Sequence, residues 1–498
     1  MREPLASLPT NRPMRFGWWL CAALILLEGV PAFAQSTAKK DASDDRSLYS
    51  LLEPSLKPFN PFMADGGAAT GHDDSYSSDV STATGPGSGA LKIEFTRSDL
   101  LCPTLVLDKK GFVVAYCVDP STKRAQVRLL APDTLSILTS LELPTSGRLG
   151  GFHMYVDPQD AVLLGAGNNH LLRLVHSADI RRRWQLRIVK DWDLSADIAR
   201  HCGGQHCDYL ESVTPDWSGR IWFATEGGVV GTVDPQGGII RSMPLPQGER
   251  ITNSISSSPD GVAVASDHAL YLLVAGADGT PLVAWREDYD RGTKIKPGQL
   301  THGSGSTPVF FGREGHPYLA IVDNADSQEH LRVYRVKAAS EGKRLVCEVP
   351  LFNAEASAAE GAPIAIGNSV VIENTFGYDY TDYAGARVRS LPGGLTRIDV
   401  RTDGSGCDLI WSNPITGSAV PKLSLRDGYI YAVERTLVGM VPEYTFLAID
   451  FRTGGTRREQ LLGSSYAFDT FQLPGVIAPH GLYYQPTVAG IIQVRRPR

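Results

Sequence analysis

The sequence lacks a strong excess of either charge, which argues against one large class of partners. Its 498 residues include 48 Lys and Arg against 54 Asp and Glu, giving a formal net charge of −6. Proteins that bind nucleic acid usually present a basic stripe to the phosphate backbone, so we expect no nucleic-acid partner. Two short basic clusters are interpreted as solvated surface: residues 181–183 and the tail Arg495, Arg496 and Arg498.

The sequence also lacks the short signatures of several enzyme classes. It contains no G-x-S-x-G, no Walker loop, no H-E-x-x-H and no dinucleotide-binding fingerprint. Apolar residues at helical spacing are scarce, whereas 50 glycines and 32 prolines are present. This balance is typical of many tight turns between short strands and predicts an all-β fold.

The N-terminus has the pattern of an export signal. Three arginines flank or precede an apolar run of 12 residues (16–27), and a small-x-small cleavage pattern follows at 32–34. The run is too short to span a bilayer, which takes about 20 residues. Residues 1–34 are therefore predicted to be a cleavable signal peptide, and the mature protein to be secreted or periplasmic with no membrane span.

Residues 35–90 are rich in Ser, Ala, Gly and Asp and contain few large apolar side chains. Such a composition offers little to bury, so the sequence predicts a disordered linker over 35–90.

From residue 91 to the end, the chain repeats roughly every 50 residues, and each unit has an apolar strand, a tight turn and two further strands. Eight tight turns mark the units: 108–111, 157–160, 216–219, 258–261, 312–315, 366–368, 425–428 and 478–481. This period predicts a single β-propeller over 91–498 with eight blades, or seven if one unit is an insertion.

The last unit ends after its third strand, and a spare strand, LKIEF (91–95), precedes the first unit. Pairing LKIEF with the last blade would close the ring and remove an exposed edge.

Outside the signal, six cysteines remain, and an even number in an exported chain favours disulfides. Six cysteines allow 15 pairings. Position within the repeat favours Cys102–Cys117 and Cys347–Cys407, and the remaining pair, Cys202–Cys207, is predicted to close a small loop.

Several segments resemble known propeller families. The segment 221–246 resembles the repeat of streptogramin lyase, and AIDFRTGG (448–455) resembles the repeat of quinoprotein (PQQ-like) propellers. In the quinoprotein repeat a tryptophan follows, and Arg458 stands in that place here. TNSISSSPDG (252–261) and IVDNAD (321–326) resemble calcium-site segments of the gluconolactonase, paraoxonase and strictosidine synthase group.

Strand alternation locates a candidate functional face. In an up-and-down sheet the first strand begins, and the second strand ends, on the same face of the ring, and nearly every unit is polar at these positions. Carboxylate and amide oxygens are the ligands that calcium prefers. The predicted calcium ligands come from three consecutive units: Asn253, Asp323, Asn324, Glu373 and Asn374. Of these, Asn253, Asp323 and Asn324 match the motif of the paraoxonase-like group, while Glu211 and Glu373 compete for a further carboxylate ligand.

Catalytic residues are predicted on the same face. His153 is the first choice for a general base, with His268 and His170 as alternatives, and Glu211 is the accompanying carboxylate. The aromatic segment TFGYDYTDY (375–383) is either a lid, a carbohydrate-stacking surface or a packed loop. The segment His201–Cys207 has the residues of a zinc or copper site, but in an exported chain a small disulfide loop is favoured.

Together these features predict an exported propeller that acts on a small molecule at this face, as a calcium-dependent hydrolase of the lactonase or esterase type. One alternative is a propeller that binds a small-molecule, carbohydrate or protein partner without catalysis. A quinoprotein oxidoreductase is a third, but PQQ is disfavoured because adjacent cysteines are missing.

Overall fold

The computed structural model describes residues 59–497 except 66–67, 205–206, 314–315, 340–341 and 381–388. All described residues belong to one compact unit, Arg46–Arg498. The predicted signal peptide and residues 35–58 of the predicted linker lie outside the described residues. Within the described residues, no helix has the length and apolar character needed to cross a membrane.

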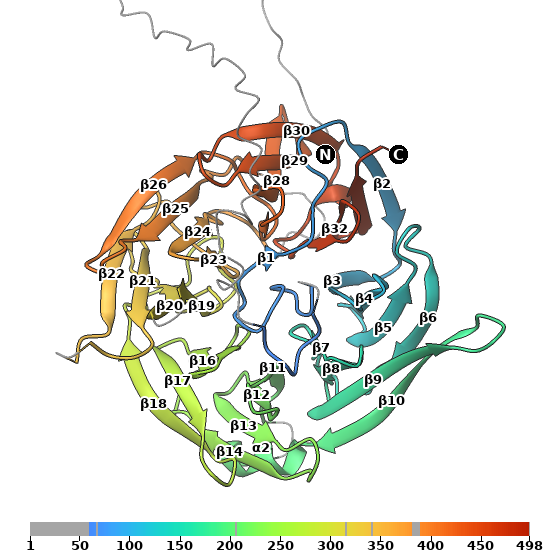
Figure 1. The fold of residues 1–498 in the computed structure, drawn as a ribbon, viewed down its shortest axis with the longest axis vertical. Coiled ribbons are helices and arrows are strands. Elements are labelled where there is room, and N and C mark those ends of the chain that lie inside the picture. Colours follow the sequence, from blue (N-terminus) through green and yellow to red (C-terminus); the bar gives the residue numbers. More distant parts are fainter. Residues whose placement is uncertain are drawn as a thin grey trace, which may run out of the picture. The chain divides into compact units, whose positions relative to one another are not determined.

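The described chain forms eight antiparallel sheets, or blades, arranged around a central axis, and the predicted eight-bladed propeller is confirmed (Figure 1). Blades 1–4 follow chain order, each from the inner strand outward: β3 (Leu101–Leu107), β4 (Val113–Asp119), β5 (Arg124–Leu130), β6 (Ile137–Glu142); β7 (Tyr155–Val156), β8 (Val162–Gly165), β9 (His170–Ala178), β10 (Trp184–Asp193); β11 (Leu210–Pro215), β12 (Ile221–Thr225), β13 (Val229–Val233), β14 (Ile240–Pro244); β15 (Ser256–Ser258), β16 (Gly261–Ala265), β17 (Ala269–Ala275), β18 (Pro281–Asp288).

Blades 5–7 continue the pattern, and blade 8 begins with the last three strands of the chain. Their strands are β19 (Val309–Arg313), β20 (His316–Val322), β21 (His330–Arg335), β22 (Leu345–Pro350); β23 (Ile364–Ile366), β24 (Ser369–Glu373), β25 (Leu395–Val400), β26 (Cys407–Asn413); β27 (Lys422–Ser424), β28 (Tyr429–Val438), β29 (Val441–Asp450), β30 (Thr456–Gly463); β31 (Val476–Ala478), β32 (Leu482–Thr487), β33 (Gly490–Arg495). Two short helices lie between blades, α2 (Ser195–Cys202) and η2 (Tyr466–Phe468).

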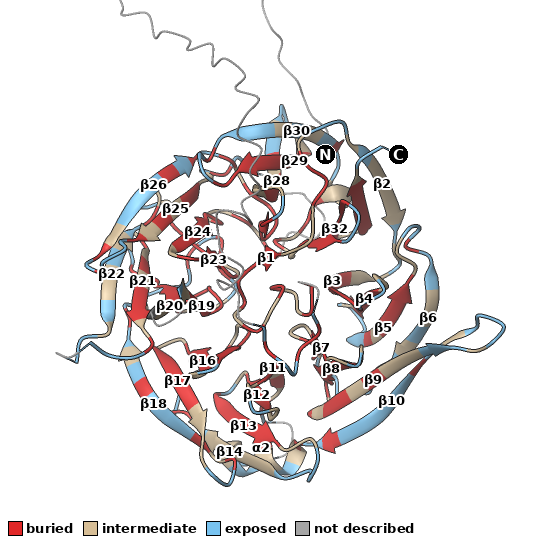
Figure 2. Ribbon diagram, viewed as in Figure 1, coloured by how far each residue is buried: buried red, intermediate tan, exposed pale blue. Residues whose placement is uncertain are grey.

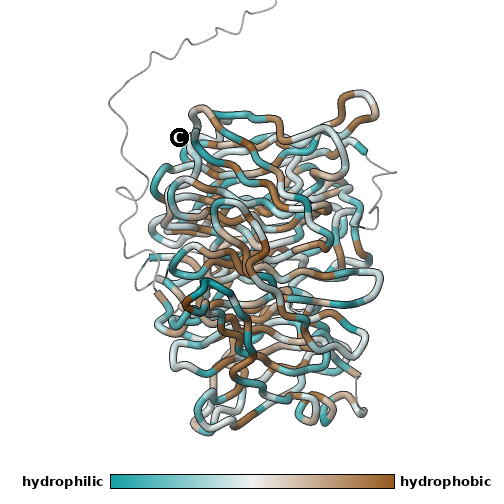
Figure 3. Tube along the Cα trace, turned by 90° about the vertical axis from the view of Figure 1, so that its right-hand side faces the viewer, coloured by the Kyte–Doolittle hydropathy of each residue, from teal (hydrophilic) through white to brown (hydrophobic). Residues whose placement is uncertain are grey.

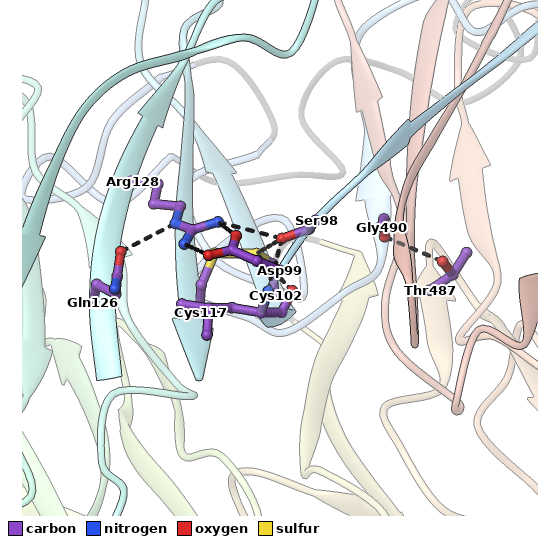
Figure 4. Close-up of a disulfide and its surroundings, with 9 residues drawn as sticks. Ser98, Asp99, Cys102, Cys117, Gln126, Arg128, Thr487 and Gly490 are labelled. Atoms are coloured by element: carbon purple, nitrogen blue, oxygen red, sulfur yellow. Dashed lines mark hydrogen bonds and ion pairs between the residues drawn. A yellow bond between two sulfur atoms is a disulfide. The ribbon is translucent and has the colours of Figure 1, made fainter. Parts of the chain in front are cut away.

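The ring closes as the sequence predicts. Strand β2 (Lys92–Arg97) pairs antiparallel with β33, so the first strand of the ring completes the last blade. The junction where the chain leaves β2 for blade 1 is fastened by side chains (Figure 4). There Arg128 of β5 donates hydrogen bonds to both oxygens of Asp99, at 2.7 and 3.1 Å, beside the Cys102–Cys117 disulfide.

All three predicted disulfides are present: Cys102–Cys117 between β3 and β4, Cys202–Cys207 across a loop, and Cys347–Cys407 between the outer strands of blades 5 and 6. Three disulfides are typical of proteins that fold in an oxidising compartment.

Burial follows the radial position of the strands. Inner strands are buried almost throughout, whereas outer strands such as β10 and β26 are mostly exposed, with two buried residues each (Figure 2). Viewed from the side, hydrophobic segments run along the strands of the stack and many connecting loops are hydrophilic (Figure 3). The apolar side chains between neighbouring blades form the core, as expected for sheets packed face to face.

The predicted linker is wrong for residues 68–90, most of which are buried in the ring. Residues 68–81, here called the channel segment, lie in the central opening and curve past successive inner strands, and strand β1 (Val80–Ser81) within them pairs parallel with β27 (Figure 1). Its carbonyl groups accept hydrogen bonds from backbone N–H groups of six inner strands, those of Leu107, Val156, Ser257, Phe310, Ala365 and Leu423. Small side chains suit this position because eight inner strands leave little room near the axis.

Candidate functional site

The polar face predicted from strand alternation is called here the upper face, where the inner strands begin and the second strands end. Two predicted catalytic residues meet on it. His153 Nε2 lies 3.5 Å from Glu211 Oε1, and the two side chains are 25% and 26% exposed. They come from adjacent blades. His153 precedes β7 of blade 2 and forms a parallel β-bridge with Ser212, the residue after Glu211 in β11 of blade 3. The structure therefore places a histidine–carboxylate pair at the mouth of the channel.

Aromatic residues support this pair from below. The ring of Phe152, next to His153, packs edge-on against Tyr116 with centroids 5.2 Å apart. Burial raises the pKa of Tyr116, and the nearby charge of Glu211 adds to the rise. Gly151 adopts a positive φ of 91°, and a Cβ there would lie 2.8 Å from the Tyr116 ring. A glycine is needed because this turn brings the backbone directly onto the aromatic ring.

The two alternative bases are paired differently. His170 Nδ1 lies 2.6 Å from Asp191 Oδ1 on the outer strand of its own blade. His268 Nδ1 lies 2.9 Å from the carboxylate of its chain neighbour Asp267. Neither contact joins two blades, so His153 is the histidine of the three that is paired across a blade boundary.

The predicted calcium ligands Asp323 and Asn324 are buried and bonded within blade 5 and its preceding loop. Asp323 accepts hydrogen bonds from the His330 backbone N–H at 2.7 Å, and its other oxygen lies 3.1 Å from His330 Nδ1. Burial raises the pKa of Asp323 even though these hydrogen bonds oppose the rise. Asn324 Oδ1 accepts a hydrogen bond from Gln299, and its Nδ2 donates to the carbonyl of Arg291.

The side chains of Asn253 and Asn374 also form hydrogen bonds with backbone groups nearby. Asn253 Nδ2 donates to the carbonyl of Ser304 at 2.9 Å. Asn374 Oδ1 accepts hydrogen bonds from the N–H groups of Ala358 and Phe376, and its Nδ2 donates to two carbonyls. No hydrogen bond or ion pair among the described residues joins two of the five predicted ligands.

Glu373 differs from the other four. It is 8% exposed, and its Oε1 has no hydrogen-bond partner within the described structure. A Cβ on Gly417 would lie 1.2 Å from that oxygen, so the carboxyl packs directly against the backbone of blade 7. Burial raises the pKa of Glu373 well above its ordinary value.

Glu329, Glu360 and Glu373 form a group of enclosed carboxyl groups that the sequence patterns did not connect. Glu329 lies near Glu360, and Tyr380 lies near both Glu360 and Glu373. Burial raises the pKa of Glu360 to about 8, and the pKa of Glu329 likewise to about 8 despite its contact with Lys296. Glu329 Oε1 lies 3.4 Å from Lys296 Nζ and accepts a hydrogen bond from Gln299 at 3.1 Å. Glu329 precedes β21, the third strand of its blade. The sequence prediction used only the starts of first strands and the ends of second strands, so it did not include Glu329.

The aromatic segment 375–383 lies over this group as a packed loop in its described part, residues 375–380. Tyr378 donates a hydrogen bond to Asp469, which also accepts one from Tyr444 at 2.6 Å. Arg435 lies over the Tyr378 ring, with its guanidinium carbon 4.6 Å from the centroid. The alternative of a packed loop is supported because both Tyr378 and Tyr380 are buried.

A calcium ion needs six to eight oxygen ligands close together. Within the described ranges, no group of three or more His, Cys, Asp or Glu side chains is arranged to hold a metal. The oxygens of Asp323, Asn324 and Asn374 already accept protein hydrogen bonds, so these five residues do not form a ready ligand set. Calcium binding therefore stays a prediction, and the proposed reaction does not depend on it.

The His201–Cys207 loop is closed by its disulfide, as favoured from the sequence. His201 Nε2 lies 3.0 Å from Ser242 Oγ, whereas residues 205–206 lie outside the described structure.

Comparisons with known proteins add little to the site. No family model matches the chain. An uncharacterized protein of Archaeoglobus fulgidus is 25% identical over 327 residues, which cover 60% of this chain and 62% of that protein, so the chain spans less than two thirds of it.

The solved structures that match this chain have low sequence identity and low TM-scores. Sqt1 of Saccharomyces cerevisiae matches with a TM-score of 0.41 and 12% identity, covering 68% of this chain and 93% of Sqt1. A Lactobacillus plantarum protein gives 0.39 and 13%, covering 62% and 83%. Dihydro-heme d1 dehydrogenase NirN gives 0.34 and 12%, covering 70% and 72%. At this level no function is transferred from any of them.

Proposed function

We propose that this protein is an exported hydrolase that cleaves a small lactone or ester on its upper face. The observation that carries the proposal is the His153–Glu211 pair, in which both side chains reach solvent and two blades contribute one residue each. A carboxylate that holds an imidazole in place is a recurring arrangement for general-base catalysis.

The roles follow from the geometry. Because Nε2 of His153 faces Glu211, Nδ1 is the nitrogen that faces away from the carboxylate. In the proposed reaction Nδ1 accepts a proton from water as the water oxygen attacks the acyl carbon. The proton then passes to the alkoxide that leaves, so the products are a carboxylic acid and an alcohol, which remain joined when the substrate is a lactone. Glu211 orients the imidazole and offsets its positive charge.

We expect His153→Gln to lower kcat by at least about 100-fold, a typical contribution of a positioned general base. The measurement is steady-state hydrolysis of a panel of lactones and aryl esters by the purified mature protein. His268→Gln is the matched control, since it removes another histidine of the upper face and is expected to retain activity. Absence of turnover on the whole panel, or equal losses in both variants, would refute the proposal.

Calcium is the second part of this proposal and is tested separately. If calcium contributes, chelation is expected to lower the melting temperature, and added calcium is expected to restore it. Elemental analysis of protein prepared without chelator gives an independent reading. An unchanged melting temperature together with no bound calcium would remove the metal from the proposal and leave the His153 prediction standing.

A second function, binding without catalysis, is favoured by the unpaired Glu373 carboxyl beneath the aromatic loop. A buried polar atom without a partner is uncommon in folded proteins and often marks a position for a ligand or water. A thermal-shift screen with monosaccharides and small ammonium compounds tests this alternative. A shift in the wild type that disappears in Glu373→Gln would support binding there, and no shift with any compound would contradict it.

A further inference from the structure

The outer hairpin of blade 2 is set apart from the rest of the ring. Strands β9 and β10 pair along their full length, from His170 opposite Asp193 to Ala178 opposite Trp184. Their connecting turn, residues 179–183, extends beyond the outer edge of the ring (Figure 1). Residues 179–183 are called here the hairpin tip.

The hairpin tip has a defined backbone. Asp179 Oδ1 accepts hydrogen bonds from the N–H groups of Arg181 at 2.8 Å and Arg183 at 2.9 Å. The other oxygen of Asp179 accepts one from Arg183 Nε at 2.6 Å. The Asp179 carboxylate is therefore occupied by hydrogen bonds within the turn. The side chains of residues 180–182 are exposed on this ordered turn.

The positive charge of this hairpin is concentrated at its tip. Between His170 and Asp193 the basic residues are Arg173, Arg181, Arg182, Arg183, Arg187 and Lys190, and the acidic residues are Asp179, Asp191 and Asp193. Asp191 and Asp193 lie at the end of β10 that is far from the tip. Among the described residues, no acidic side chain pairs with Arg181 or Arg182. The protein as a whole carries a net charge of −6, so the hairpin has the opposite sign to the chain.

An apolar side chain stands within this basic tip. Ile180 is fully exposed, with a relative accessibility of 101%, and Ile188 and Val189 on β10 are 40% and 41% exposed. Exposing a large apolar side chain to water is unfavourable relative to burying it. Basic residues on an edge strand also prevent sheet-to-sheet aggregation, but that role requires no apolar residue at the tip.

The part of the hairpin next to the tip is fixed to the opposite face of the ring from the candidate site. Trp184 packs on Phe112 with ring centroids 4.6 Å apart, and His176 Nε2 lies 3.2 Å from Asp108 Oδ2. Asp108 and Phe112 belong to the turn between β3 and β4, which lies where inner strands end. The tip is thus held rigidly on this lower face, away from His153 and Glu211.

We infer that the hairpin tip docks the protein on an anionic phospholipid surface. Arg181 and Arg182 meet the headgroup phosphates, and Ile180 enters the interface between headgroups and acyl chains. This combination of basic and apolar side chains is typical of peripheral membrane contacts. A soluble polyanion satisfies the arginines but leaves Ile180 in water, so the lipid surface fits the tip better.

The test is co-sedimentation of the purified mature protein with phosphatidylcholine vesicles that contain one third phosphatidylglycerol. We expect binding to these vesicles at low salt and little binding to pure phosphatidylcholine. Arg181→Gln/Arg182→Gln is expected to lower the partition coefficient roughly 30-fold, since each basic residue near an anionic surface contributes about 1 kcal/mol. Ile180→Ser is expected to lower it a few-fold and, unlike the arginine pair, to do so at high salt as well.

Lys294→Gln/Arg389→Gln is the matched control, because it removes two exposed basic residues from the upper face. The control is expected to bind vesicles as the wild type does, and all variants to keep the wild-type melting temperature. Three results would overturn the inference: no binding to the anionic vesicles, an equal loss in the control, or retention on heparin without any vesicle binding. None of these outcomes depends on hydrolysis at the upper face.

Discussion

Replacing Lys422 by methionine is expected to lower the free energy of unfolding by about 3–5 kcal/mol, the usual consequence of removing one partner of a buried ion pair. Lys422 is 1% exposed at the start of β27. Its Nζ lies 3.1 Å from Asp73 Oδ2 and donates hydrogen bonds to Asp79 and to the carbonyl of Gly71 at 2.6 Å. Burial alone would lower the pKa of Lys422, but the two carboxylates outweigh that effect and raise it.

The loss arises because two carboxylates of the channel segment then remain buried beside each other. Asp73 and Asp79 are 2% and 0% exposed, and the Nδ1 of His72 lies 3.1 Å from Asp79 Oδ1. Chemical denaturation monitored by tryptophan fluorescence measures the change. Adding Asp73→Asn and Asp79→Asn to Lys422→Met is expected to recover much of the stability, since no net buried charge remains.

Lys343→Met, at an exposed site, serves as the control and is expected to change stability by less than about 0.5 kcal/mol. A Lys422→Met protein as stable as this control would show that the channel segment does not hold the ring together.

Replacing Glu360 by glutamine is expected to stabilise the protein at alkaline pH and to leave it unchanged at acid pH. Glu360 is half-buried, and its carboxyl lies close to the backbone at Gly305. It accepts one hydrogen bond, from the Leu300 N–H at 3.2 Å, which a glutamine oxygen can also accept. Burial raises the pKa of Glu360 to about 8, and the neighbouring Glu329 contributes to the rise.

The sign follows from proton linkage. Between pH 4.5 and about 8 the unfolded chain loses this proton while the folded protein keeps it, so stability falls as pH rises through that window. Below pH 4.5 both states are protonated and no penalty exists. Each pH unit of the window costs roughly 1.4 kcal/mol, and we expect Glu360→Gln to gain about 2–4 kcal/mol at pH 8.

Thermal unfolding of both proteins at pH 4.5, 6 and 8 tests this expectation. The exposed residue Glu459 provides the control, since Glu459→Gln is expected to show no pH-dependent gain. A Glu360→Gln protein that is destabilised equally at all three pH values would mean that the carboxylate is ionised and paired in the folded state.

Two groups of sequence features were enough to predict the scaffold. Tight turns at fixed spacing and apolar strands between them predicted eight blades, because each pattern is local and repeats. The spare strand at 91–95 and the truncated last unit predicted the closure by β2 and β33. Position within the repeat also predicted Cys102–Cys117 and Cys347–Cys407, since such positions in one blade or in adjacent blades lie close together in a closed ring. Cys202–Cys207 was predicted because the two cysteines are close in the chain.

The candidate site was predicted only in part. Strand alternation selected His153 and Glu211 separately, and the structure brings them to 3.5 Å because the starts of β7 and β11 run side by side. The same rule selected Asn374 and Asn324, whose amides instead bond nearby backbone. Polarity at a strand end indicates which face a residue occupies, but it does not distinguish a ligand-binding oxygen from one that caps a loop.

Tertiary structure alone decided the remaining features. The channel segment has the composition of a linker, yet it is held by backbone hydrogen bonds to inner strands and by the Lys422 pair, and neither depends on large apolar side chains. Glu329, Glu360 and Glu373 are distant in the chain and become a group only when blades 5 and 6 pack. By itself the sequence determined an eight-bladed, disulfide-linked ring, because local patterns specify strands and turns. Long-range burial determined which charges lie in the channel, beneath the aromatic loop and on the hairpin tip.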